Sequence, residues 1–278
     1  VVEWNKAFER IGFKDAVQAK IQPDDADFDT LDARHASIRW MTTARPAFGG
    51  IGPSQADPRT GEILDADIGI DATSFRARRS SSLETIPLRP LPNVAGTPPR
   101  KAYGDDFSCN YAEEAAEHQA FAMSLLDARG ELALDGPAAE SFMQAHLKSV
   151  VVHEVGHTLG LRHNFKASTW KTLEEINDPK RAGEAISASV MDYLPVNMAG
   201  KDVKQANYFS PTIGPYDYWA IEYGYKTFSG DEDKELAKIA SRCTEPGLEF
   251  GTDEDLFLQA DPRTNLFDLG KDPLAFAR

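Results

Sequence analysis

Residues 153–163 gather the side chains that could do chemistry, because three of the six histidines of this 278-residue chain lie there. His153 and His157 are four residues apart, so on a helix they share a face and both imidazoles can reach one metal ion. Glu154 lies at the flank of that face, where its carboxylate can contact a metal-bound water without binding the metal itself. This pattern predicts metal-assisted hydrolysis with Glu154 as the general base.

The residues after this pair supply a third nitrogen. Gly160 can adopt a positive φ angle and end the helix, so the chain can turn back and present His163 to the same ion. Three protein ligands with a fourth position open are typical of a catalytic zinc site rather than a structural one. The competing interpretation is an amphipathic core helix with surface histidines, which does not explain why the three lie so close together.

Helices must position these side chains. The helix that carries the histidine pair is predicted from Pro137, in its first turn, to Leu161. A second long helix is predicted over residues 112–129. Near the start of the chain, Trp4, Phe8 and Ile11 lie along one stripe, which is typical of an amphipathic helix.

Two segments have the alternation of strands. Ser37–Met41 is predicted as a short strand, and Ile63–Ile70 alternates apolar residues with small or acidic ones. The carboxylates on one face of the second segment favour an edge strand. Residues 76–104 are rich in serine and proline and are predicted to form a long surface loop.

Composition limits the partners. The formal net charge is −14, which argues against nucleic acid and anionic lipid as main partners. No apolar run has the length needed to cross a bilayer. The two cysteines, Cys109 and Cys243, could be separate thiols or one long-range disulfide, and the spacing alone leaves both open.

The long histidine motif resembles that of the metzincin clan of zinc peptidases. Residues 189–193 (Ser-Val-Met-Asp-Tyr) look like the Met-turn of that clan, in which a methionine, here Met191, forms an apolar floor under the metal. The resemblance implies that Tyr193 hydrogen-bonds the oxyanion of the reaction. It also implies an α+β, metzincin-like fold, with a twisted mixed sheet and an active-site helix in an upper lobe above a mostly irregular and helical lower lobe. Asn164 departs from the clan, whose better-known families have Glu, Asp, Ser or Pro at that position.

The chain is also similar to a group of large bacterial zinc-dependent metalloproteases. The similarity lies in the opening residues 4–8 and in the turn and strand of residues 57–63. It implies one catalytic domain over residues 1–278, with an upper lobe of about 1–163 and a lower lobe of about 164–278, within a longer multidomain protein. It further implies a periplasmic or secreted location, and a substrate peptide lying antiparallel to the strand Ile63–Ile70.

Together these observations predict a zinc-dependent endopeptidase acting on peptides or proteins. One catalytic Zn²⁺ ion would be held by His153, His157 and His163, and Glu154 would activate the zinc-bound water.

One alternative keeps this function but changes a ligand, and two others change the function. Glu174 or Glu175 could be the third ligand in place of the third histidine. The chain could also be an inactive zinc-holding binding module, or a zinc hydrolase of a non-peptide amide. The other histidines, His35, His118 and His146, are predicted to be surface or core residues rather than ligands.

Overall fold

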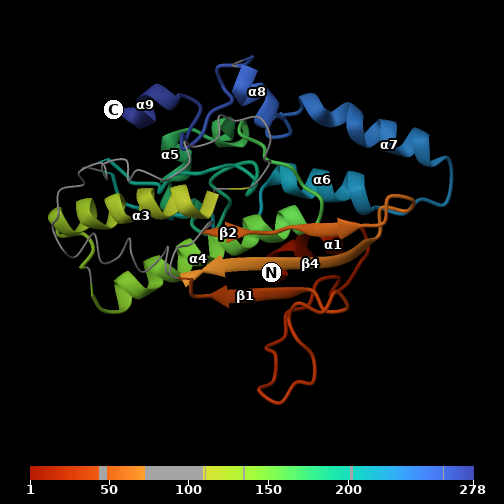
Figure 1. The fold of residues 1–278 in the computed structure, drawn as a ribbon. Coiled ribbons are helices and arrows are strands. Elements are labelled where there is room, and N and C mark those ends of the chain that lie inside the picture. Colours follow the sequence, from red (N-terminus) through yellow and green to blue (C-terminus); the bar gives the residue numbers. More distant parts are fainter. Residues whose placement is uncertain (44–48, 73–108, 110, 134, 201–202, 259) are drawn as a thin grey trace.

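The computed structural model describes residues 1–43, 49–72, 109, 111–133, 135–200, 203–258 and 260–278. A small mixed sheet and two long helices come from the first part of the chain, and mainly irregular chain with short helices follows the third histidine of the motif (Figure 1). This is the α+β, zincin-like architecture that the sequence predicts. The predicted loop over residues 76–104 lies outside the described residues.

The sheet is built around one strand. β4 (Ile63–Asp71) pairs in parallel with β1 (Ser37–Met41) on one side, and antiparallel with β2 (Gly50–Ile51) and β3 (Ser54–Ala56) on the other. The prediction that this segment is an edge strand is therefore wrong. Acidic residues on one face of a strand do not reveal whether its two edges are paired, because side chains point to the faces of a sheet and the pairing lies in its plane. The two short partner strands are rich in glycine and polar residues and give no strand signal of their own.

Two long helices pack beside this sheet, α3 (Tyr111–Ala128) and α4 (Pro137–Thr158) (Figure 1). α4 ends three residues earlier than predicted, because the chain reverses at Gly160, whose φ angle is +83°. Val150, Val152 and Val155 of α4 are buried in the main core, and Val150 lies against β2, where its side chain would be 3.3 Å from a Cβ atom on Gly50.

The N-terminal segment braces α4. A 3₁₀ turn over Val2–Trp4 leads into α1 (Asn5–Arg10). The indole of Trp4 is fully buried and donates a hydrogen bond of 3.0 Å to the backbone oxygen of Val152. The predicted apolar stripe of this helix thus packs beside the histidine motif.

The second half of the chain closes over the other side of α4. α6 (Pro215–Tyr225) packs against α1, with the guanidinium of Arg10 3.4 Å from the ring centroid of Tyr218. Within the described part of the chain, no helix combines the length and apolar character that crossing a bilayer requires. The short helices of this half are α5 (Leu173–Ile176), α6 (Pro215–Tyr225), α7 (Glu232–Ala240), α8 (Asp253–Leu258) and α9 (Pro273–Ala277), with 3₁₀ turns at Ala167–Trp170, Pro179–Arg181 and Ser241–Thr244.

Candidate metal centre

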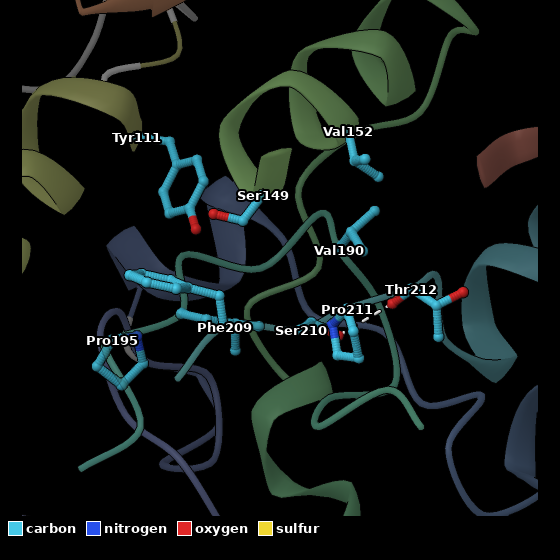
Figure 2. A pocket seen from close by; sticks show the side chains of 10 residues that line it. Tyr111, Ser149, Val152, Val190, Pro195, Phe209, Ser210, Pro211 and Thr212 are labelled. Atoms are coloured by element: carbon cyan, nitrogen blue, oxygen red, sulfur yellow. Dashed lines mark hydrogen bonds between the residues drawn. The ribbon is translucent and has the colours of Figure 1, made fainter. Parts of the chain in front are cut away.

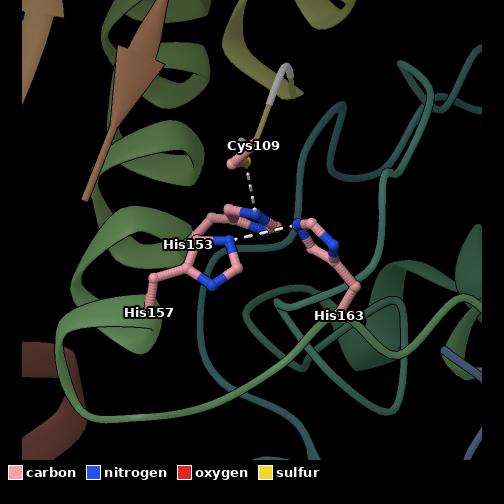
Figure 3. Close-up of side chains that lie close together, drawn as sticks. All are labelled: Cys109, His153, His157 and His163. Atoms are coloured by element: carbon pink, nitrogen blue, oxygen red, sulfur yellow. Dashed lines mark hydrogen bonds between the residues drawn. The ribbon is translucent and has the colours of Figure 1, made fainter. Parts of the chain in front are cut away.

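The end of α4 brings the three histidines of the motif together. His153 and His157 lie one turn apart on the helix, and the chain then reverses, with the backbone N–H of Leu161 donating 3.0 Å to the oxygen of Gly156. The reversal returns His163 to the same point (Figure 3). The ring centroid of His157 lies 4.7 Å from the ring centroid of His153 and 4.7 Å from that of His163.

Backbone and side-chain acceptors fix which nitrogen of each ring faces the centre. His153 Nδ1 donates 2.7 Å to the carbonyl of Val190, and His157 Nδ1 donates 3.0 Å to the carbonyl of Leu161. Because a carbonyl oxygen can only accept, each Nδ1 carries the proton and each Nε2 presents a lone pair. Burial keeps both rings neutral: it lowers the pKa of His153 well below its usual value and that of His157 to about 4.

The third ring is oriented by a carboxylate. His163 Nδ1 lies 2.8 Å from Asp253 Oδ1, so its Nε2 also faces the centre. The Nε2 atoms of His157 and His163 are only 3.1 Å apart, and with both protons on Nδ1 the two lone pairs face each other. A cation between them removes that repulsion, and three imidazole nitrogens with acceptors behind them are a ligand set that zinc favours. The residues therefore fit a zinc ion.

Glu154 lies beside this group and is fully buried. Its Oε2 atom has no hydrogen-bond partner among the described residues, and burial raises the pKa of the side chain to about 8. Two glycines let the neighbouring strand approach it: a Cβ atom on Gly50 would lie 3.0 Å from Oε1, and one on Gly52 would lie 2.5 Å from the backbone oxygen of Glu154. The carboxylate is therefore buried and tightly packed, with one oxygen available.

The predicted Met-turn segment lies against the same stretch of α4. Met191 is fully buried, and its sulfur is so close to the Cα of Gly156 that a Cβ atom there would overlap it. The preceding residues are fixed by Asp217 of α6, which accepts from the Ser189 hydroxyl at 2.6 Å and from the Val190 N–H at 3.0 Å. A methionine on this turn thus packs directly behind the histidine pair.

Comparison with known families agrees with this geometry. The family described as Met-zincin matches residues 135–278, just over half of the chain, including α4 and the Met191 segment. The chain belongs to the Met-zincin family. Membership implies zinc as the metal and supports a zinc metallopeptidase in general. Searches of curated proteins and of solved structures found no match to the chain.

Tyr193 of this Met-zincin is buried beside the three rings. Its ring packs edge-on against His163, with 4.8 Å between centroids, and its hydroxyl lies 3.4 Å from the sulfur of Cys109. The residue to which the resemblance assigns an oxyanion contact is therefore close to the candidate metal position.

Two residues of the site were not found from the sequence. Asp253 lies in a segment rich in acidic residues, and the sequence leaves open whether Cys109 is a free or a bridged thiol. Both cysteines are free, Cys243 is exposed, and Cys109 is buried next to the histidines. The ligand atoms of Cys109 and the three histidines all lie within 4.8 Å of one another. No sequence signal marks either residue, because both reach the site through long-range contacts.

The other candidates lie elsewhere. Glu175 forms a capping box with Thr172 at the start of α5, and neither it nor Glu174 belongs to the metal-holding group. His118 stacks on Phe267, and His146 is buried within α4. A hollow of about 10 Å³ has room for about one water molecule. It is lined by residues that include Tyr111, Ser149, Val152, Val190 and Phe209 (Figure 2). None of the three histidines of the motif lines it.

Proposed function

We propose that this Met-zincin is a zinc endopeptidase in which His153, His157 and His163 hold the ion and Glu154 is the general base. The observation that carries the proposal is the convergence of three Nε2 lone pairs, each fixed by an acceptor at Nδ1, beside a buried carboxylate with one oxygen available. Met191 is proposed as the apolar floor of the site.

The residues of the chain would share the reaction as follows. When bound, zinc supplies a Lewis acid that polarises a carbonyl oxygen and lowers the pKa of water. Glu154 accepts the proton of the attacking water on Oε2 and passes it to the leaving amine. Burial raises its pKa, which favours the step in which the carboxylate takes up the proton. The Tyr193 hydroxyl donates a hydrogen bond to the developing oxyanion.

The substrate is proposed to add to the sheet at β2 rather than at β4. β4 is paired with β1 over Asp67–Asp71 on one side and with β2 and β3 on the other, whereas among the described strands β2 has a partner on one side only. Gly50 and Gly52 hold this part of the chain against Glu154. An extended peptide bound to that edge by main-chain hydrogen bonds would lie close to the base. Residues 1–163 and 164–278 would then form the two lobes of one catalytic unit. Its location is proposed to be periplasmic or secreted.

A charge-neutral substitution of the base tests the proposal. The variant Glu154→Gln should bind zinc like the wild type, while its cleavage of casein and of a peptide library should fall about 100- to 10,000-fold. The matched control is Glu140→Gln, the same change at an exposed position of α4, which should cleave like the wild type. Wild-type cleavage by Glu154→Gln would rule out the proposed base. Zinc binding without cleavage of any peptide would favour the inactive binding module, and cleavage of non-peptide amides alone would favour the other hydrolase.

A further inference from the structure

The sulfur of Cys109 occupies the place where the reaction would happen. It lies 3.4 Å from His153 Nε2 (Figure 3). It also lies 3.4 Å from the Tyr193 hydroxyl and 3.7 Å from Glu154 Oε1. These are a proposed metal ligand, the proposed oxyanion donor and the proposed base. A buried atom in contact with all three lies where the attacking water and the scissile carbonyl would have to be.

The chemistry of this atom suits the metal as well. Thiolate sulfur and imidazole nitrogen are the preferred ligands of zinc, and a tetrahedral site with four protein ligands is closed, whereas a catalytic site leaves one position open. The four ligand atoms lie within 4.8 Å of one another, a spacing compatible with contact to one central ion. With the sulfur included, the group has the composition of a closed site.

We propose that Cys109 is the fourth ligand of the zinc ion in this conformation, which is a resting form of the enzyme that excludes water and substrate. Cleavage then requires the sulfur to leave the metal. This inference rests on the proposed function, but Cys109 lies outside the residues matched by the family, so membership does not assign it this role.

The exchange balances without an oxidant or reductant. On binding, the S–H bond breaks, its proton passes to solvent and a sulfur–zinc bond forms. On release, the sulfur takes a proton back and a water molecule occupies the vacated position. No electron is transferred in either direction.

Cobalt(II) in place of zinc gives a readout that does not depend on activity. Thiolate bound to cobalt produces charge-transfer absorption in the near ultraviolet, and the chain has only two cysteines, one of them exposed. The full 278-residue chain and the matched control Cys243→Ala should both show the band, and Cys109→Ala should lose it while still binding cobalt. A band in Cys243→Ala can only come from Cys109, so the result stands even if the other variant folds poorly.

The resting form also predicts a gain of activity. Zinc-loaded Cys109→Ala should cleave a peptide library faster than the wild type, and Cys243→Ala should match the wild type. Three results would each overturn this inference alone. They are a wild-type protein that binds cobalt without the band, a band lost only in Cys243→Ala, and a folded Cys109→Ala that cleaves no faster than the wild type. Failure of all three proteins to bind cobalt would overturn the proposed function with it.

Discussion

Replacing Asp253 tests how the chain holds its third histidine. The carboxylate accepts from His163 Nδ1 at 2.8 Å and also lies 3.5 Å from Arg162. Burial raises the pKa of Asp253, but the hydrogen bond and the electrostatic interaction with His163, together with hydrogen bonds from Thr252 and the backbone, outweigh burial and lower the pKa to about 2. The group is therefore ionised at neutral pH, where it fixes the tautomer and the orientation of the ring.

The two variants Asp253→Asn and Asp253→Ala should weaken zinc binding to different extents. Loss of such a partner costs about 10- to 100-fold in metal affinity. The side chain of Asp253 is 33% exposed, so solvent screens its charge and the amide variant should lie near the lower limit. A tenfold loss corresponds to about 1.4 kcal/mol. Alanine also removes the acceptor, so its loss should be larger.

Zinc affinity measured by competition with a chelator at pH 7.5 checks this ranking. The neighbouring Glu254→Gln is the matched control, because Glu254 pairs with the exposed Arg162 and not with His163. It should change the affinity by less than about twofold. Equal affinities for the wild type and Asp253→Ala would refute the idea that this carboxylate supports a metal ligand.

Two further changes test parts of the fold around the site. Burial lowers the pKa of His146 to about 3, so this residue contributes stability that is lost as pH falls below its unfolded value. Between pH 7.5 and 5.5 the stability of the wild type relative to His146→Leu, measured by urea unfolding, should fall by roughly 1.4 kcal/mol, and a constant difference would show that the ring is not held neutral. Gly156→Ala should destabilise the protein by about 1–3 kcal/mol in thermal or urea unfolding, since its Cβ would overlap the Met191 sulfur and lie 2.9 Å from Trp4. Gly224→Ala, in open space within α6, should instead be neutral or stabilising.

The parts of the site that could be predicted are local in the sequence. The histidine pair depends on helical spacing alone, and the return of His163 depends on one glycine with a positive φ angle. Both features are set by residues within one or two turns of one another, so the sequence pattern is sufficient. The two long helices and the strands Ser37–Met41 and Ile63–Asp71 were found for the same reason.

The parts that could not be predicted depend on the tertiary fold. Cys109 precedes His153 by 44 residues, and Asp253 follows His163 by 90. Neither lies in a periodic pattern, and a lone cysteine or an aspartate in an acidic segment usually has another role. The central position of β4 is not predictable for the same reason, because β4 pairs with β2, a short segment that contains glycine and has little strand propensity.

Asn164, the residue that departs from the better-known metzincins, explains how the distant carboxylate reaches the site. Its side-chain N–H donates 3.0 Å to the carbonyl of Glu249, and its side-chain oxygen accepts 3.1 Å from the N–H of Gly251. An amide can donate one hydrogen bond and accept the other at the same time. A carboxylate at this position could only accept, so one of its oxygens would face the Glu249 carbonyl oxygen without a hydrogen between them. The amide thus anchors the segment that ends two residues later at Asp253. The unusual residue after the third histidine and the carboxylate behind that histidine are therefore parts of one structural arrangement.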